Sequence, residues 1–448
     1  PRCAGGFLWD LMDQGVVRTD KNNYVDCMGN FGADGIVGPH AEKEGSYYTI
    51  KEVWCPVQLT WNDVEKGELT LSNQYNFVNL KDCRFSYRLL QMPAMGSTQV
   101  KVLKQGNLSS PDVAPGKEAQ VKIPMMANAD AVEIKAVNHE GEEIMTWSRG
   151  VKSEERRVKN SSAPSTSSAA YADQADAVEV KAGGRTYRFA KKDGRLMGVE
   201  VGSKAISLSN GPRFMAARRS DRSLDQFYNH DDKEAEKKKT LDTVFVDQNA
   251  FSVFEWKEAE AKLVATYQHG SLDEVDWQFL SDGSVAVTCH YNFGGVVDMM
   301  GMAFDYPESK VRSKAWVGNG PYRVWQNREQ GPQYGYWQND YNDPIPAESW
   351  DYPEFKGYFA NVKWMQFKTD EGKIGFSGLT ADEHMGVYTP RDGRDGLLYT
   401  LPQTGLAVFK VIPSVRNKVN TTDLNGPSAQ PKWLNGKGKV EFTLNFEL

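Results

Sequence analysis

The chain has 448 residues, of which 40% are hydrophobic and 25% charged, the composition of a folded protein with about three domains. Its 53 Lys and Arg residues against 59 Asp and Glu residues give a net charge of −6, which argues against nucleic-acid-binding and membrane-surface proteins, since these carry a basic excess. No apolar run approaches the roughly 18 residues of a membrane-spanning helix.

Cysteine and histidine are too scattered to suggest a metal centre. The cysteines are odd in number and form no CxxC pair, which favours buried free thiols over a disulfide framework or a zinc knuckle. The six histidines never fall at HxH or HxxxH spacing, so we expect no metal site built on nitrogen or sulfur. The five cysteines are Cys3, Cys27, Cys55, Cys83 and Cys289.

Residues 1–55 are rich in glycine and contain too few periodic elements to close a core of their own. The pattern predicts an apolar strand at residues 6–9 and one short helix at residues 47–54. Because the chain opens inside an apolar strand, we expect it to have been cut from a longer protein. We also expect this segment to be held by docking, so that its removal leaves the melting temperature of the following domains unchanged.

From residue 56 the apolar residues alternate with polar ones, and turns rich in Asn, Gly, Pro and Asp separate the alternating stretches. Short strands at this spacing over residues 56–150 indicate an immunoglobulin-like β-sandwich. Residues 151–176 begin with charges and continue with a Ser- and Ala-rich run, which we interpret as a linker. The alternating residues are Leu69 and Leu71, Phe85 and Tyr87, Val121 and Ile123, and Val132, Ile134 and Ala136.

Residues 177–448 have the pattern of a large two-sheet sandwich with little helix. Glycine-containing turns between alternating stretches predict successive hairpins. These turns fall at residues 183–184, 193–194, 202–203 and 281–284. The chain ends on a predicted strand with five apolar residues on one face. They are Val440, Phe442, Leu444, Phe446 and Leu448.

Aromatic side chains are concentrated between Trp316 and Phe367, where they make up 14 of 52 residues, and acidic residues are interleaved with them. We expect half of these rings to lie in the core. Residues 334–352 lack alternation and contain two prolines, which predicts a long loop. Exposed aromatic residues on a loop suggest carbohydrate contact, with Trp337 as the candidate, whereas base stacking would need a basic groove.

The run GGFLWDLMDQG, at residues 5–15, places the ring of Trp9 beside the carboxylate of Asp10. Sugars stack their C–H faces on aromatic rings, and carboxylates accept hydrogen bonds from hydroxyls. The pair therefore suits a sugar at the end of a strand. The alternative interpretation is a buried strand followed by a loop, with Trp9 in the core.

This run resembles the last barrel strand of glycoside hydrolase family 2, in its β-galactosidase branch, and NFGADGIV at residues 30–37 resembles the loop and strand that follow. GNGPYRVWQNR, at residues 318–328, resembles a block of the C-terminal β-supersandwich of the same enzymes. The resemblance implies a mainly β fold in three parts. They are a short remnant of a (β/α)8 barrel at 1–55, an immunoglobulin-like β-sandwich at 56–150, and a large β-supersandwich at 177–448.

The resemblance also implies sugar-contacting residues beside Asp10. Trp9 matches a tryptophan that packs against the sugar, and Phe31 matches a phenylalanine at the rim. Asp34 falls where these enzymes usually have Asn, at a position that contacts a sugar hydroxyl and a cation. Phe31 and Asp34 are therefore the expected border of a Na or Mg ion in the longer enzyme. A turn formed by Asp34 and Gly35 is the alternative.

Enzymes of this branch hydrolyse terminal β-galactosides with two glutamates, whose carboxyl groups lie roughly 5–5.5 Å apart. In the family both glutamates lie on barrel strands that precede the one matched here. We therefore expect the chain to lack the catalytic pair and to supply sugar-contacting and structural parts. The expected ligand is a β-galactoside. The longer enzyme would be a homo-oligomer, in a periplasmic or secreted rather than a cytoplasmic location.

Two further function classes stay open on the sequence. A non-catalytic carbohydrate-binding β-protein would use the aromatic loop as its site. A lyase on a similar supersandwich would need a Tyr or His base near an Arg, and His384 and Tyr388 are the candidates, although no motif supports them.

Overall fold

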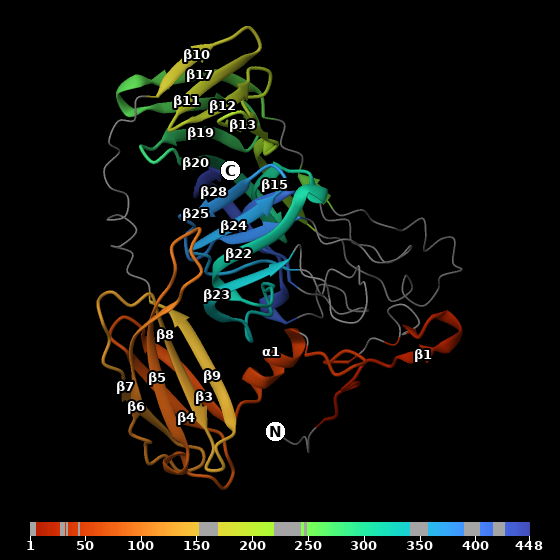
Figure 1. Cartoon of the computed structure of the whole chain (residues 1–448), viewed down its shortest axis with the longest axis vertical. Coiled ribbons are helices and arrows are strands. Elements are labelled where there is room, and N and C mark those ends of the chain that lie inside the picture. Colours follow the sequence, from red (N-terminus) through yellow and green to blue (C-terminus); the bar gives the residue numbers. More distant parts are fainter. Residues whose placement is uncertain are drawn as a thin grey trace.

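The computed structural model describes residues 6–26, 32, 35–43, 45–151, 169–218, 243–245, 249–340, 357–388, 404–414 and 426–448. Figure 1 shows an immunoglobulin-like sandwich (orange) at one end of an elongated molecule and a larger sandwich (yellow-green to blue) at the other. The N-terminal residues (red) run beside both. Among the described residues, no helix has the length and apolar character needed to cross a membrane.

Every alternating stretch predicted between residues 56 and 150 forms a strand. The strands make two antiparallel sheets whose inner faces share one core, which contains Phe85, Ile134 and Trp147. The three-stranded sheet is β3 (Val57–Asp63), β4 (Glu68–Asn73) and β7 (Glu118–Lys122). The four-stranded sheet is β6 (Lys101–Leu108), β5 (Arg84–Gln91), β8 (Ala131–Val137) and β9 (Glu143–Gly150).

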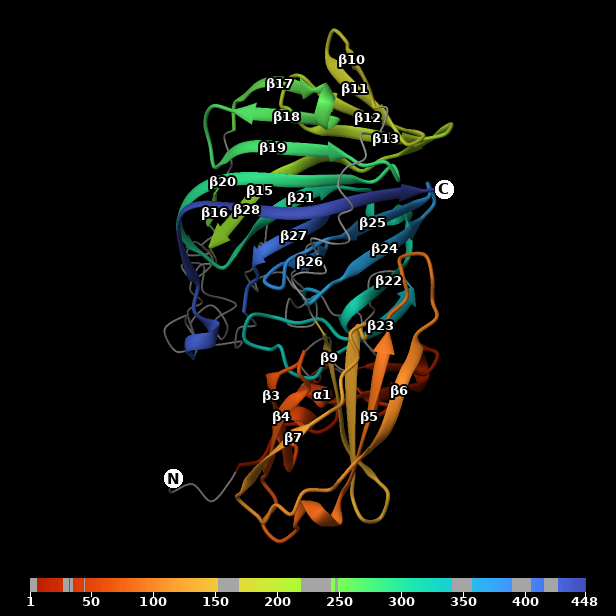
Figure 2. The same cartoon turned by 90° about the vertical axis from the view of Figure 1, so that its left-hand side faces the viewer.

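The larger sandwich packs a ten-stranded sheet against a nine-stranded sheet (Figure 2). The ten-stranded sheet runs β10 (Ala170–Asp173), β11 (Ala177–Ala182), β12 (Arg185–Ala190), β13 (Leu196–Val201), β15 (Ser209–Arg218), β21 (Met299–Asp305), β27 (Leu406–Val411) and β26 (His384–Val387), with β14 (Lys204–Ile206) on β13 and β16 (Thr243–Phe245) on β15. The nine-stranded sheet runs β17 (Phe251–Lys257), β18 (Lys262–Tyr267), β19 (Leu272–Phe279), β20 (Val285–Val297), β28 (Lys432–Glu447), β25 (Lys373–Ser377), β24 (Trp364–Thr369), β22 (Val311–Gly320) and β23 (Gln333–Asp340).

The predicted hairpins are present because glycine occupies their turn positions. Gly183 and Gly184 join β11 to β12 with φ values of +52° and +77°, in the left-handed region that side chains other than glycine rarely adopt. Short 3₁₀ helices connect other strands. They are Thr19–Lys21, Leu80–Asp82, Glu258–Glu260, Glu308–Lys310 and Pro427–Ala429.

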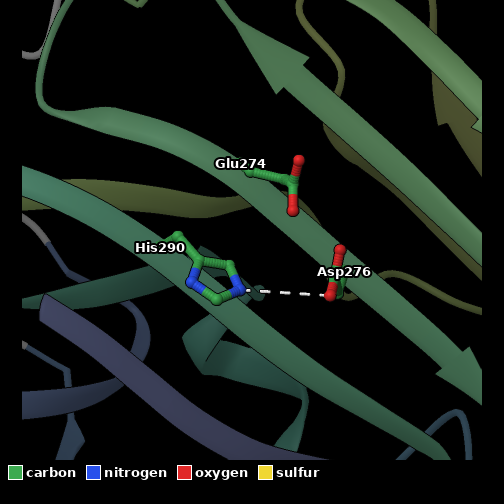
Figure 3. A group of neighbouring side chains, drawn as sticks. All are labelled: Glu274, Asp276 and His290. Atoms are coloured by element: carbon green, nitrogen blue, oxygen red, sulfur yellow. Dashed lines mark ion pairs between the residues drawn. The ribbon is translucent and has the colours of Figure 1, made fainter.

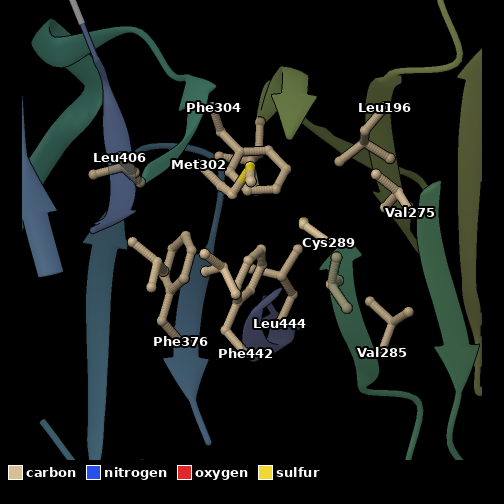
Figure 4. Packing of buried hydrophobic residues seen from close by; sticks show 14 of the residues in the cluster. Leu196, Val275, Val285, Cys289, Met302, Phe304, Phe376, Leu406, Phe442 and Leu444 are labelled. Atoms are coloured by element: carbon tan, nitrogen blue, oxygen red, sulfur yellow. The ribbon is translucent and has the colours of Figure 1, made fainter. Parts of the chain in front are cut away.

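The core of the larger sandwich is filled by apolar side chains from the inner faces of both sheets (Figure 4). The rings of Phe304, on β21, and Phe442, on β28, have centroids 5.8 Å apart, and Phe376 lies 6.1 Å from Phe442. The alternation predicted for the last strand is confirmed from Val440 to Phe446. Leu448 is the exception, because it follows the end of β28 and is 57% exposed.

A third apolar cluster joins the two sandwiches. Leu90 and Met92, which follow each other closely near the end of β5, pack with Tyr334 and Trp364 of the larger sandwich. The indole Nε1 of Trp364 donates a hydrogen bond of 2.9 Å to the carbonyl oxygen of Pro93. The β-domains are therefore fixed to each other by direct packing.

Two sequence-based expectations about segments are wrong. Residues 170–173, which we assigned to the linker, form β10 and pair with β11, whereas residues 152–168 lie outside the described part. Residues 334–340, which we assigned to a loop, lie in β23 and pair with β22. Its first half lacks alternation because both faces make apolar contacts there: Tyr334 and Tyr336 join the cluster between the sandwiches, and Trp337 packs against the core of the larger one.

The N-terminal segment differs from a barrel remnant in one respect. No strand forms at residues 6–9, because a strand needs a hydrogen-bonded neighbour and no described residue pairs with this stretch. The described strands here are instead β1 (Val16–Arg18) and β2 (Tyr24–Asp26), which pair with each other. The short helix predicted at 47–54 is confirmed as α1 (Gly45–Val53), which buries none of its residues fully.

The expectation of free, buried cysteines is confirmed wherever the structure describes them. Cys55 and Cys83 lie in the core of the immunoglobulin-like sandwich, and Cys289 lies in the core of the larger one. Burial raises the pKa of all three thiols, which keeps them protonated and unreactive. Cys3 and Cys27 lie outside the described residues.

Candidate functional site

The motif predicted to contact a sugar leaves its tryptophan open to solvent. Trp9 is 80% exposed, so the alternative of a core tryptophan does not hold. The carboxylate of Asp10 is fixed from both sides: Oδ1 accepts a hydrogen bond of 2.6 Å from the backbone N–H of Leu11, and Oδ2 accepts one of 3.2 Å from Nε2 of Gln14. The segment thus presents an accessible ring beside an oriented carboxylate.

Of the other sequence-predicted site residues, Trp337 is the one that the structure describes. Phe31 and Asp34 lie outside the described residues, and with them the predicted border of a Na or Mg ion. Trp337 lies in β23, half-buried, and its Nε1 donates a hydrogen bond of 3.1 Å to the carbonyl oxygen of Gly318. No hydrogen bond or ring contact joins Trp337 to Trp9 or Asp10, all three of which are described.

The block at residues 318–328 is largely buried and packs the end of β22 against neighbouring loops. Trp325 is fully buried, and the guanidinium carbon of Arg323 lies 4.8 Å from the centre of the Phe359 ring. A side chain at Gly318 would come within 3.0 Å of the Cα of Val362, which explains why glycine suits this position. The block therefore has a structural role.

The same region clamps α1 to the larger sandwich. The ring of Tyr322 stacks on Tyr48, and the Thr49 hydroxyl donates a hydrogen bond of 3.0 Å to the carbonyl oxygen of Gln330. The backbone N–H of Gly331 donates one of 2.6 Å to Oε2 of Glu52, whose pKa is raised by burial. Helix α1 is thus docked on the larger sandwich.

A cleft of about 550 Å³ lies between the immunoglobulin-like sandwich and the larger one. Its walls carry three cations and three acids beside apolar groups, so it suits a ligand that combines several hydrogen-bonding groups with apolar faces. The lining residues from the smaller sandwich are Val64, Glu65, Arg149 and Gly150. Those from the larger one are Asn319, Glu329, Tyr334, Ala360, Asn361, Ala381, Asp382, His384, Lys410 and Lys432.

An ion-pair network orients the acidic wall of this cleft. The Nζ of Lys410 lies 3.0 Å from Oδ2 of Asp382 and 3.4 Å from Oε1 of the fully buried Glu383. Burial alone would raise the pKa of Asp382, but hydrogen bonds from Thr380 and Lys410 outweigh it and lower the pKa. Asp382 is therefore ionised and acts as a hydrogen-bond acceptor near neutral pH.

Of the two candidates for a lyase, His384 lines the cleft, whereas Tyr388 follows the end of β26 and is not among the lining residues. Burial, together with the charge of Lys432, lowers the pKa of His384 to about 4. A histidine with this pKa is neutral near pH 7 and is a weak base, which disfavours general-base catalysis by His384. The Nδ1 atom of His384 is buried without a hydrogen-bond partner.

Apart from His384, the charged residues of the cleft were missed on the sequence because they come from strands and loops that are far apart in the chain. Arg149 and Lys410 are 261 positions apart and meet only because the two sandwiches pack together. No local spacing encodes such a juxtaposition.

Comparison with known proteins agrees with this architecture. Residues 181–408, just over half of the chain, match the family described as β-galactosidase small chain. The chain belongs to this family. Residues 69–147, within the immunoglobulin-like sandwich, match β-galactosidase domain 4. The resemblance to the C-terminal part of family 2 β-galactosidases is therefore confirmed.

Three curated relatives carry the name β-galactosidase. The one from Oenococcus oeni is 20% identical over 475 aligned positions, which cover 97% of this chain and 44% of the relative. The one from Pectobacterium atrosepticum is 31% identical over 17% of this chain and 8% of the relative. The one from Priestia megaterium is 29% identical over 18% of this chain and 9% of the relative. The chain thus spans less than half the length of these relatives.

Among solved structures, a cycloalternan-forming enzyme from Listeria monocytogenes aligns with 87% of this chain and 30% of its own, at 10% identity and a TM-score of 0.20. A likeness of this degree carries no argument about function.

Proposed function

We propose that this member of the β-galactosidase small chain family is the C-terminal part of a retaining β-galactosidase-like glycoside hydrolase. In this proposal the chain supplies sugar-contacting and structural parts, and another part of the longer protein supplies the catalytic glutamates. The coverage of the Oenococcus oeni relative supports it, because nearly the whole chain aligns with only 44% of that β-galactosidase. The substrate class is terminal β-galactosides.

One observation carries the sugar-contacting role: Trp9 is exposed on a segment that is docked to the larger sandwich through α1. An exposed indole ring offers a flat apolar face for the C–H groups of a pyranose. Each oxygen of Asp10 already accepts one hydrogen bond and retains a lone pair for a sugar hydroxyl. The indole ring would stack on one face of the sugar. The carboxylate would accept a hydrogen bond from a hydroxyl and so fix the rotation of the sugar on the ring.

The test uses the longer protein with a nitrophenyl β-galactoside. Trp9→Ala should lower kcat/KM by about tenfold or more, which corresponds to a loss of about 1.4 kcal/mol of transition-state binding. Trp9→Phe should retain most of the activity. Trp433→Ala is the matched control, because Trp433 is also exposed, at 71%, but lies on β28. Equal activity of Trp9→Ala and Trp433→Ala would contradict the role of Trp9.

The isolated chain should show no turnover of the same substrate. Neither protonation of the leaving group nor attack on the anomeric carbon can proceed without the glutamate pair. Release of nitrophenol that co-purifies with the chain through successive columns would overturn this part of the proposal.

The cleft between the sandwiches supports a second candidate, a non-catalytic carbohydrate-binding protein. Its volume of about 550 Å³ is sufficient for a small saccharide, and its lining is rich in groups that bind hydroxyls. Calorimetric titration of the isolated chain with galactose and lactose separates the two candidates. Binding that is lost in Asp382→Ala but kept in Trp9→Ala would favour this second function.

A further inference from the structure

Two carboxylates and an imidazole meet on the face of the nine-stranded sheet that is opposite its core, and none of the three residues lines the cleft. Glu274 and Asp276 lie two residues apart on β19, so their side chains point to the same face. His290, on β20, is the direct cross-strand partner of Glu274. Figure 3 shows the three side chains projecting together from these neighbouring strands.

The three groups offer metal ligands at short range. One ligand atom from each residue lies within 4.8 Å of the others, and Nε2 of His290 is 3.9 Å from Oδ2 of Asp276. Ligands around one tetrahedral zinc ion are roughly 3.4 Å apart. All three side chains are only partly buried. Small rotations about their side-chain bonds are therefore enough to shorten the distances between ligand atoms to those found around zinc.

A second observation concerns the pairing of the Asp276 carboxylate. The Oδ1 atom of Asp276 is buried and has no hydrogen-bond partner, although a buried carboxylate oxygen costs free energy unless it is paired. The other oxygen, Oδ2, receives a hydrogen bond of 3.2 Å from Nζ of Lys262. Oδ1 is thus the oxygen of this carboxylate that has no partner among the described residues.

We propose that Glu274, Asp276 and His290 form a site for a divalent transition-metal ion, with Zn²⁺ as the preferred ion. One imidazole nitrogen and two carboxylate oxygens suit borderline ions, whereas Mg²⁺ and Ca²⁺ favour oxygen ligands alone. Cys289 takes no part, because it points into the core on the opposite face of β20. The ion would tie β19 to β20 and would keep an open position for water.

Nearby charged side chains affect the affinity of this site for a cation. Lys262 shares Asp276 with the ion, and its Nζ is also 3.6 Å from Oε2 of Glu260. On the other side, Lys439 lies opposite His290 in β28 and pairs with Glu441 at 3.0 Å. These ammonium groups weaken the binding of a cation. Removal of the charge of Lys262 should therefore tighten it.

The experiment measures Zn²⁺ bound to the isolated chain by equilibrium dialysis, with the free ion buffered. We expect binding at the site to weaken by at least about tenfold in Glu274→Gln and in His290→Ala. Lys262→Met should bind Zn²⁺ more tightly than the unmodified chain. Glu274→Gln preserves the size of a partly exposed side chain, so its fold is expected to stay intact, and circular dichroism checks this.

His139→Ala is the matched control, because His139 also lies beside a carboxylate, 3.8 Å from Glu140, but belongs to no group of three ligands among the residues that the structure describes. This variant should bind Zn²⁺ as the unmodified chain does. Co²⁺ provides an independent readout, since its visible absorption should report nitrogen and oxygen ligation that disappears in His290→Ala. If Glu274→Gln and His290→Ala retain the Zn²⁺ affinity of His139→Ala, or if the chain binds no Zn²⁺, the proposal is wrong.

Discussion

The ring of Tyr322 stacks on the ring of Tyr48, with centroids 4.7 Å apart and planes inclined by 29°. Tyr322 belongs to the block at residues 318–328 and Tyr48 belongs to α1. One aromatic pair therefore joins the larger sandwich to the segment that carries Trp9. The hydroxyl of Tyr322 adds a hydrogen bond of 3.2 Å to the carbonyl oxygen of Lys43. The block thus serves as the anchor of the N-terminal segment.

Replacement of Tyr322 should therefore loosen α1. Tyr322→Ala removes a stacked pair and a hydrogen bond, together worth about 1–3 kcal/mol. Amide hydrogen exchange in α1 should speed up by about tenfold or more, while exchange in β20 and β28 stays unchanged. Tyr322→Phe keeps the ring and should retain most of the protection. Equal exchange in Tyr322→Ala and the unmodified chain would show that other contacts hold the helix.

A deletion series tests how tightly the N-terminal segment is bound. Removal of residues 1–44 should leave the melting temperature unchanged, because the described residues of that stretch are mostly exposed. Removal of residues 1–55 should lower it, since it deletes α1 and also Cys55, which is 4% exposed in the core of the smaller sandwich. This differs from the expectation drawn from the sequence. Calorimetry provides the measurement. Identical melting curves for both deletions would contradict this prediction and support the expectation drawn from the sequence.

Gly301 on β21 should tolerate no side chain. A Cβ atom there would lie 2.3 Å from the carbonyl oxygen of Val408 and 2.7 Å from the Cα of Phe409. These are backbone atoms of the paired strand β27, so Gly301→Ala should cost about 3 kcal/mol in the free energy of unfolding.

Gly294→Ala is the control for Gly301→Ala, because a Cβ atom at Gly294 meets nothing closer than 3.9 Å. It should change the free energy of unfolding by about 0.5 kcal/mol or less. Urea denaturation of both variants measures the difference, and a cost at Gly301 no larger than that at Gly294 would mean that β21 and β27 can move apart.

Glu371 should make stability depend on pH. Burial alone would raise its pKa, but hydrogen bonds from Lys310, Ser207 and Tyr306 outweigh this effect and lower the pKa below its ordinary value of 4.5. Because the pKa is lower in the folded state, the ionised carboxylate stabilises the fold above about pH 4.5. This contribution is lost as the pH falls through the folded-state pKa.

Glu371→Gln should therefore lower the free energy of unfolding by about 1–3 kcal/mol at neutral pH. The difference from the unmodified chain should shrink in acid below about pH 4.5. Glu200→Gln, at an exposed position of β13, should show neither effect. Urea denaturation across this pH range provides the measurement, and a difference that is constant with pH would contradict the ionic origin.

The sequence predicted the strands well wherever one face is buried and the other is exposed to solvent. Leu69 and Leu71 in β4 illustrate this, since their alternation follows directly from the pleat of a half-buried strand. The prediction failed at β23, where Tyr334 faces the cluster between the sandwiches and Trp337 packs against the core of the larger one. Where both faces of a strand make apolar contacts, as at residues 334–337, no alternation can be recognised.

The candidate sites were harder to predict than the fold. His290 and Glu274 are 16 positions apart, and only the register of β19 against β20 makes them neighbours. The strand predicted at residues 6–9 shows a second limit of sequence-based prediction. An apolar run forms a strand only when another strand completes its hydrogen bonds, and a sequence window does not reveal whether that neighbour is present.

The apolar face predicted for residues 440–448 offers a matched pair of positions, one within β28 and one just after it. Phe442 is 2% exposed and packs against Phe304 and Phe376, whereas Leu448 is 57% exposed. Phe442→Ala should lower the free energy of unfolding by about 3–5 kcal/mol, because the neighbouring rings cannot fill the cavity. Leu448→Ala should change it by about 0.5 kcal/mol or less. A cost below about 1.5 kcal/mol for Phe442→Ala in urea denaturation would mean that the two sheets can close over the missing ring.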